Sequence, residues 1–154
     1  MHIFEKNIKK LGIIIPEIIP PYANYVPGKI IDNTIFISGQ VPSQEGKFPY
    51  LGKIGIDITE NEGIKAAEIC GINIIAVLKF LIKNQWNKIN TFVKIGGFVN
   101  CSSSYTNQPK IINGASDLIV KIFGEQGRHT RFAVGVNSLP LNVPVEIDAI
   151  VKLK

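Results

Sequence analysis

The chain has 154 residues, of which 45% are hydrophobic and 19% are charged, and its formal net charge is +5 at pH 7. This length suits one domain with its own core, so we predict a single domain over residues 1–154. No apolar stretch approaches the roughly 20 residues that a transmembrane helix requires. The N-terminus also lacks the apolar core of a signal peptide. We therefore expect a soluble cytoplasmic protein with no membrane contact, and an organelle stays open as an alternative.

Cys70 and Cys101 are the only cysteines, which are too few for a disulfide scaffold and are typical of buried thiols in a reducing compartment. Cysteine and histidine do not recur at zinc-binding spacings, so we expect no metal and no cofactor. The lysines are spread along the chain, and no aromatic RNA-binding strand motif is present. Weak attraction to RNA follows from the charge, but a dedicated nucleic-acid site is not indicated.

The N-terminal segment is predicted to contain one short helix. Residues 3–11 have an amphipathic helical pattern that ends at Gly12. Several prolines between residues 13 and 27 then predict an extended or looped segment, because proline lacks the N–H that regular elements need.

A β-hairpin is predicted next. Residues 29–31 and 34–38 are rich in β-branched and aromatic residues, and they flank Asp32 and Asn33, which suit a tight turn. A loop that contains glycine and proline follows over residues 43–56.

A long amphipathic helix is predicted to begin after Thr59. Thr59 and Glu62 form a capping box, in which the hydroxyl and the carboxylate satisfy free N–H groups at the helix start. One apolar stripe follows at spacings of three and four residues: Ile64, Ala67, Gly71, Ile74, Leu78 and Leu81. We expect the helix to end near Lys83 and Asn84.

Residues 89–101 are predicted to form a strand, because they are rich in β-branched and aromatic residues such as Val93 and Phe98. The adjacent glycines Gly96 and Gly97 suggest a β-bulge within it.

The last third of the chain is predicted to contain a helix over residues 109–124 and strands over residues 131–136 and 143–153. The order after the N-terminal helix is therefore β-β-α-β-α-β-β. It indicates an α+β fold in which two helices pack on one face of a mixed sheet. The last two strands are apolar on both sides, so we expect other copies of the chain to cover the second face.

Arg128 and Arg131 are the only arginines, and they flank His129. A guanidinium is a planar fork of donors that can pair with a carboxylate or phosphate through two parallel hydrogen bonds, which an ammonium cannot do. The segment 127–134 is therefore a candidate anion-binding site. The alternative is that both arginines are solvated surface charges. His129 has no obvious partner, and we expect a surface or interface role for it rather than catalysis.

Several separated segments share an order of residues that is quite specific. They are Tyr-Val-Pro-Gly at 25–28, Phe-Ile-Ser-Gly-Gln-Val-Pro at 36–42, Asn113, Arg-Phe-Ala-Val-Gly-Val-Asn-Ser-Leu-Pro at 131–140 and Val-Glu-Ile-Asp-Ala at 145–149. Together they resemble the YjgF-type reactive intermediate deaminase family, also labelled endoribonuclease L-PSP. The resemblance covers residues 20–154, and the helix and extension of residues 1–19 look like a longer branch of the family.

The resemblance implies a chorismate-mutase-like α+β fold of the bacillar type and a homotrimer with clefts between subunits. It also implies hydrolysis of reactive 2-imino acids, or their enamine tautomers, to 2-keto acids and ammonia. The expected enzyme is therefore similar to a 2-iminobutanoate/2-iminopropanoate deaminase, and its partner is a small imino or keto acid.

The resemblance also implies roles for individual residues. Arg131 matches the arginine that clamps the substrate carboxylate, and Glu146 matches the glutamate that orients the attacking water. The substrate-binding positions are matched by Tyr25, Ser38, Gly39, Asn113 and Ala133. The backbone carbonyl of Ala133 matches the acceptor for the imine nitrogen, although typical members have cysteine there, and Phe132 stands where many have serine. These departures concern the substrate range more than the reaction.

The residues by themselves leave structural roles open as well. Glu146 could pair with a lysine, and Ser38 and Asn113 could satisfy local backbone groups. Three other functions also stay open beside the deaminase. They are an endoribonuclease or translation inhibitor with His129 as base, a non-catalytic trimer that binds small carboxylates, and a structural or chaperone-like trimer.

Overall fold

The computed structural model describes residues 1–18 and 24–154. Residues 19–23 of the predicted extended segment lie outside the described residues. The elements are α1 (Ile3–Lys10), β1 (Gly28–Ile31), β2 (Thr34–Gln40), α2 (Glu60–Leu81), β3 (Ile89–Asn100), α3 (Gln108–Phe123), β4 (Thr130–Val136) and β5 (Val145–Leu153). Among the described helices, none has the length and apolar character needed to cross a membrane.

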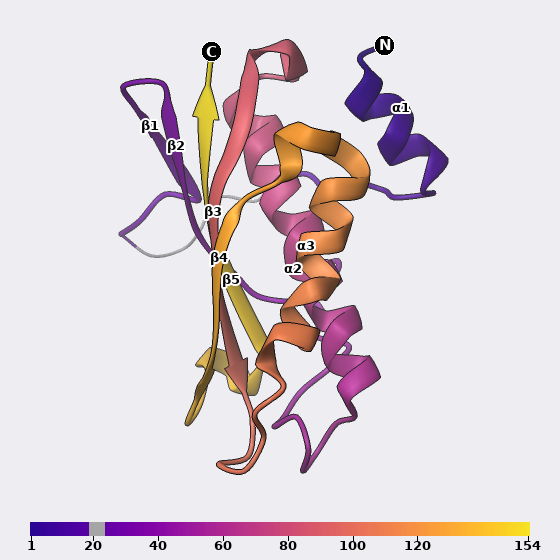
Figure 1. Cartoon of the computed structure of the whole chain (residues 1–154), viewed down its shortest axis with the longest axis vertical. Helices are drawn as coiled ribbons and strands as arrows, with labels where there is room; N and C mark the ends of the chain where they lie inside the picture. Colours follow the sequence, from indigo (N-terminus) through magenta and orange to yellow (C-terminus); the bar gives the residue numbers. More distant parts are fainter. Residues whose placement is uncertain (19–23) are drawn as a thin grey trace.

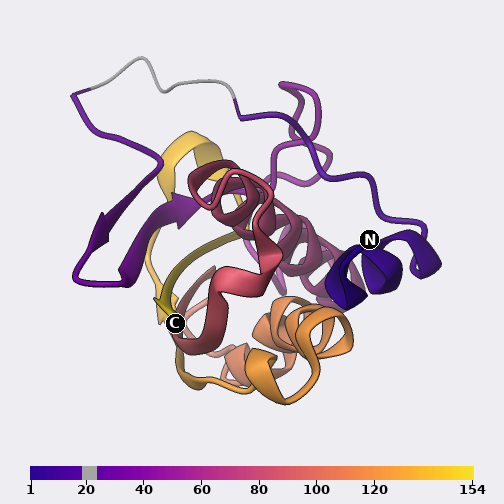
Figure 2. The ribbon, with the colours of Figure 1, turned by 90° about the horizontal axis from the view of Figure 1, so that it is seen from above.

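The five strands form one mixed sheet in the order β1-β2-β5-β3-β4. β3 and β4 run parallel, and the other neighbours run antiparallel. α2 and α3 cover one face of the sheet, and α1 lies on the far side of these helices (Figures 1 and 2). α1 is held there by Phe4, whose ring lies 4.8 Å from that of Phe123 in α3. The predicted α+β fold with two helices on one face is therefore confirmed.

The predicted local signals are present at the ends of the elements. The Thr59 side chain accepts from the Glu62 N–H and the Glu62 carboxylate accepts from the Thr59 N–H, so the capping box forms at the start of α2. Asp32 and Asn33 have φ of 46° and 60°, as a tight hairpin turn requires. β5 begins at Val145, two residues later than predicted, since Pro144 has no N–H for the ladder.

The predicted β-bulge at Gly96 and Gly97 is wrong. Both glycines pair with β5 without interruption, and the register shifts of β3 lie before Lys94. The glycines serve close packing instead. A Cβ on Gly96 would lie 2.5 Å from the Asp148 carboxylate, and a Cβ on Gly97 would lie 2.5 Å from the Ile112 side chain of α3.

The sheet has one face buried under the helices and one open face. Alternate residues of β2, β3 and β5 point toward the helices and are buried: Ile35, Ile37, Ile95, Val99, Val145, Ile147, Ala149 and Val151. The open face keeps large apolar side chains at the surface, with Phe36 45% and Val134 43% exposed. In the described part of the chain β4 pairs with β3 alone, so its outer edge is unpaired.

Gly114 lets α3 pack closely against the backbone of α2. A Cβ there would lie 2.1 Å from the Ile64 carbonyl oxygen, and a backbone atom in a packed helix cannot move aside cheaply. Gly114→Ala should therefore lower the free energy of unfolding by about 1–3 kcal/mol, although alanine is the better helix former. Asp117→Ala, at an exposed position of the same helix, should change it by less than about 0.5 kcal/mol. Urea unfolding that ranks the two variants the other way would contradict this packing.

Candidate functional site

Arg131 lies on β4 and reaches the N-terminal half of α3. It pairs with Ile95 of β3, so its side chain leaves the sheet on the helix-covered face. Its Nη1 donates to Asn113 Oδ1 at 2.8 Å and to Ser116 Oγ at 3.1 Å. Its Nη2 makes a longer contact of 3.4 Å with the Pro109 carbonyl oxygen. The guanidinium is therefore held from one side by the polar groups of one helix.

The hydrogen bonds of Arg131 leave part of its donor set free. A guanidinium has five N–H groups, two on each terminal nitrogen and one on Nε. Both hydrogens of Nη1 have acceptors, whereas Nε has none among the described residues. Within the same residues no carboxylate pairs with Arg131. The positive charge is thus not neutralised, and the edge formed by Nε and Nη2 can receive an anion.

His129 contacts Ser116, so the expectation that His129 lacks a partner is wrong. The His129 Nε2 lies 2.9 Å from Ser116 Oγ, and Nδ1 lies 2.6 Å from the carbonyl oxygen of Gly127. Burial lowers the pKa of His129. The hydrogen bond with the Gly127 carbonyl raises this pKa, and the positive charge of Arg131 lowers it further. Sequence spacing gave no sign of this pair, since Ser116 lies in another element.

Arg128 takes no part in this cluster. Its Nε donates to Glu125 Oε1 at 2.9 Å, and both side chains are exposed. Surface ion pairs of this kind contribute little to stability. Arg128 therefore resembles the solvated charge that the sequence left open for both arginines, and Arg131 does not.

Glu146 belongs to a second group, on the open face of the sheet. It lies on β5 opposite Phe98 of β3, and its carboxylate covers Gly39 of β2, where a Cβ would come within 2.4 Å of Oε1. Among the described residues no lysine or other donor binds this carboxylate. Burial raises the pKa of Glu146, and the charge of Asp148 raises it further.

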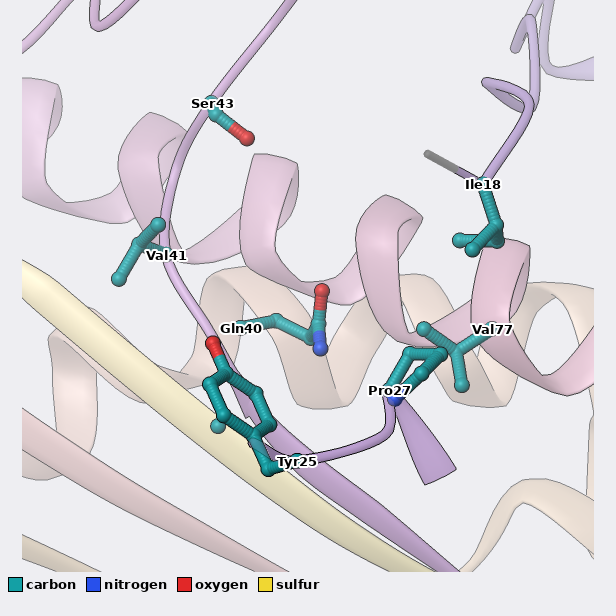
Figure 3. Close-up of a pocket in the computed structure, with 8 residues that line it drawn as sticks. Ile18, Tyr25, Pro27, Gln40, Val41, Ser43 and Val77 are labelled. Carbon is teal, nitrogen blue, oxygen red and sulfur yellow. The ribbon is translucent and has the colours of Figure 1, made fainter. Parts of the chain in front are cut away.

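Ser38 and Tyr25 lie near this second group. The Ser38 hydroxyl donates to the Val26 carbonyl oxygen at 2.7 Å, which ties β2 to the segment before β1. Tyr25 is 59% exposed and borders a cleft of about 190 Å³ between β2 and α2. The cleft is lined by Ile18, Tyr25, Pro27, Gly39, Gln40, Val41, Ser43 and Val77 (Figure 3). Most of these residues belong to the motif segments 25–28 and 36–42, whereas Ile18, Ser43 and Val77 lie outside every motif and could not be found from the sequence.

The two groups lie on opposite faces of the sheet. Arg131 and Ala133 pair with Ile95 and Gly97 and face the helices, whereas Glu146 pairs with Phe98 and faces away from them. β3 also separates β4 from β5. Within one chain the structure brings Arg131 together with Asn113, and Glu146 together with Gly39, but it does not bring Arg131 to Glu146.

Comparison with known families supports the resemblance seen in the sequence. Residues 5–152 match the family described as "YjgF/chorismate_mutase-like, putative endoribonuclease". The match spans both groups of residues and nearly the whole chain. The chain therefore belongs to the YjgF family.

Individual relatives agree with this assignment. Protein TCP17 of Trypanosoma cruzi is 38% identical over 148 residues, which cover 96% of this chain and 92% of that protein. The crystal structure of Atu1372 from Agrobacterium tumefaciens is 41% identical and superposes with a TM-score of 0.92, over 99% of this chain and 93% of that one. The E. coli protein TdcF, crystallised with bound serine, is 25% identical with a TM-score of 0.58, over 89% and 91% of the two chains.

The described residues contain no group of three His, Cys, Asp or Glu side chains that could hold a metal ion.

The lowered pKa of His129 predicts how stability depends on pH. The folded protein holds the imidazole neutral below its ordinary value of 6.5, so the unfolded chain binds more protons as the pH falls through that value. Stability from this group is complete above that value and is lost as the imidazole of the unfolded chain protonates. Urea unfolding at about pH 7.5 and about pH 5.5 should show a larger loss for the wild type than for His129→Gln, which cannot titrate. Equal losses would mean that the imidazole is not held neutral.

Proposed function

We propose that this protein hydrolyses reactive 2-imino acids, or their enamine tautomers, to 2-keto acids and ammonia. The observation that carries the proposal is the Arg131 guanidinium, which is held by polar groups of α3 and lacks a carboxylate partner among the described residues. Its Nε has no acceptor among them, and Nη2, which has two hydrogens, makes only the 3.4 Å contact with the Pro109 carbonyl oxygen, so the Nε–Nη2 edge can still donate to a ligand. Such an edge suits a carboxylate through two parallel hydrogen bonds. The serine bound to TdcF is also a small amino acid with a carboxylate, which supports a ligand of this class.

The reaction needs little beyond positioning, because an imine carbon is already electrophilic. Water adds to C2 of the imino acid, and the resulting carbinolamine expels ammonia to leave the keto acid. Arg131 would hold the carboxylate, and the Ala133 carbonyl would accept a hydrogen bond from the nitrogen. Glu146 would accept a proton from the attacking water. The raised pKa of Glu146 makes its carboxylate a stronger base than an ordinary glutamate at neutral pH.

We propose further that the site is completed by a second copy of the chain. Arg131 and Glu146 leave opposite faces of the sheet, so one chain alone cannot direct both at one ligand. The open face carries exposed Phe36 and Val134, which favours its burial against another copy. A homotrimer, as implied by the family resemblance, would place the Arg131 group of one copy beside the Glu146 group of the next.

The endoribonuclease alternative receives less support from the geometry. A general base needs a ring nitrogen that reaches the substrate, and both nitrogens of His129 are engaged by Ser116 and Gly127. Arg128 is paired with Glu125 rather than aligned with Arg131. RNA cleavage that disappears in His129→Gln while imine turnover persists would reverse this preference.

Arg131→Lys tests the carboxylate clamp. The ammonium keeps the charge but makes one directed hydrogen bond where the guanidinium makes two, so kcat/KM for 2-iminopropanoate should fall about ten- to a hundredfold. Keto acid release from freshly generated imine is the measurement, and Arg128→Lys is the matched control that should keep wild-type turnover. Wild-type rates in Arg131→Lys would exclude a bidentate clamp.

Glu146→Gln tests the role of the carboxylate. If Glu146 receives the proton of water, kcat should fall in the variant while the affinity for the keto acid product stays near that of the wild type. In the wild type, the raised pKa should place the acidic limb of the pH–rate profile above 4.5, the ordinary value for glutamate. Activity should be present above this limb and lost as the carboxylate protonates. An acidic limb that Glu146→Gln leaves unchanged would assign the titration to another group.

Mixing two inactive variants tests whether the site is shared between copies. Arg131→Ala and Glu146→Gln should each have low activity alone. After they are unfolded and refolded together, about a quarter of the interfaces should contain an intact Arg131 and an intact Glu146, so activity should return to that fraction of the wild type. No recovery in mixed oligomers, or a monomeric mass by light scattering, would rule out the shared site.

A further inference from the structure

A chain of three hydrogen bonds lies behind Arg131 and ends in the backbone. It runs from Arg131 Nη1 to Ser116 Oγ at 3.1 Å, from Ser116 Oγ to His129 Nε2 at 2.9 Å, and from His129 Nδ1 to the Gly127 carbonyl at 2.6 Å. It connects β4, α3 and the 3₁₀ turn η2 (Gly124–Gly127). Three successive elements of the chain therefore meet at one guanidinium.

The direction of each hydrogen bond follows from the chemistry of the partners. A carbonyl oxygen can only accept, so Nδ1 of His129 carries the proton that binds Gly127. In the neutral imidazole Nε2 is then an acceptor, and the Ser116 hydroxyl must donate to it. The remaining lone pairs of Ser116 Oγ are left for the N–H of Arg131, which donates to this oxygen. A neutral imidazole thus orients the serine oxygen toward the arginine.

The backbone around this chain is held closely. A Cβ on Gly127 would lie 2.7 Å from the Ile119 carbonyl oxygen, so η2 packs directly on α3 and fixes the carbonyl to which His129 is bound. Gln126 of the same turn donates to the Ile89 and Asn90 carbonyl oxygens of β3 at 2.8 Å and 2.9 Å. The Gly127 carbonyl, where the series of hydrogen bonds ends, is therefore anchored to both the helix layer and the sheet.

We propose that Ser116 and His129 are positioning residues that hold Arg131 with its Nε–Nη2 edge directed at a carboxylate. The inference rests on the proposed function in that Arg131 is the carboxylate clamp. Asn113 and Ser116 occupy both hydrogens of Nη1, so rotation that would turn Nη1 toward the ligand breaks two hydrogen bonds. The ligand is consequently met side-on by Nε and Nη2.

The pair does not serve as a nucleophile and base. Ser116 Oγ already accepts a hydrogen bond from a cation, which withdraws electron density from the oxygen that would have to attack. Ser116 also contacts the guanidinium at Nη1, away from the Nε–Nη2 edge that would meet the ligand. Its hydroxyl is suited to support Arg131 rather than to react.

The first test measures the binding of 2-oxobutyrate by calorimetry, with Ser116→Ala and His129→Leu as the disrupting variants. Each should raise Kd roughly three- to tenfold, as expected for the loss of one supporting hydrogen bond. His129→Gln, whose side-chain oxygen can accept from Ser116, should recover part of the affinity. The matched control is Ser103→Ala, which changes an exposed serine that takes no part in these three hydrogen bonds and should bind as the wild type does. Ser116→Ala should fold normally, since alanine is the better helix former.

A double-mutant cycle separates positioning from a general structural effect. In the Arg131→Lys background, Ser116→Ala should change Kd by less than twofold, about 0.4 kcal/mol, because the guanidinium on which Ser116 acts is gone. If Ser116→Ala weakens binding by the same factor in both backgrounds, Ser116 does not act through Arg131 and the proposal is overturned.

A second measurement needs no ligand. With two arginines and two histidines in the chain, side-chain nitrogen NMR can resolve each group. The His129 signals should report a neutral ring protonated on Nδ1, and the order parameter of the Arg131 Nε–H should fall in Ser116→Ala while that of Arg128 stays the same. An unchanged Arg131 order parameter would refute the positioning role. A fall in this order parameter in a protein that binds no keto acid would sink the proposed function and leave the positioning role intact.

Discussion

The parallel pairing of β4 with β3 is the constraint on which the functional arrangement depends. It places Arg131 in register with Ile95, and side chains alternate between faces along each strand, so the guanidinium must leave on the side of the helices. β4 is also the last strand of the sheet, which lets the side chain reach α3 instead of being buried under it. A shift of one residue in this register would send Phe132 toward α3 and Arg131 to the open face. The position of the anion site is thus a consequence of strand pairing.

The contacts of Arg131 explain how an arginine without a carboxylate partner is tolerated in a half-buried place. A buried charge is costly unless hydrogen bonds replace its hydration. Asn113, Ser116 and Pro109 supply neutral acceptors, which satisfy N–H groups without cancelling the charge. The neutral state of His129 serves the same end, because a second cation at this distance would repel the first. The cluster therefore keeps a positive charge available to an anion.

The glycines show how closely this fold is packed around the candidate site. Gly97 allows Ile112 of α3 to lie directly on β3, and Gly114 allows α3 to touch the backbone of α2. On the other face, Gly39 makes room for the Glu146 carboxylate. Each of these contacts joins segments that are far apart in the sequence. The expectation of a β-bulge at Gly96 and Gly97 failed for this reason, since a glycine required by a distant side chain looks the same in a sequence as one required by the local backbone.

The sequence by itself determined the local features: the Thr59–Glu62 capping box, the Asp32–Asn33 turn and the strand and helix order. It also drew attention to Arg131 as one of two arginines in a chain rich in lysine. The local features depend on interactions within a few residues or on hydrophobic periodicity, which a single chain displays directly. Its motifs also marked the YjgF family, which the comparisons confirmed. Only the tertiary structure decided that His129 and Ser116 meet behind Arg131, that a cleft forms between β2 and α2, and that Arg131 and Glu146 lie on opposite faces. These facts depend on which strands become neighbours and how helices cross, and the free energy that selects them is spread over the whole core rather than encoded in any one segment.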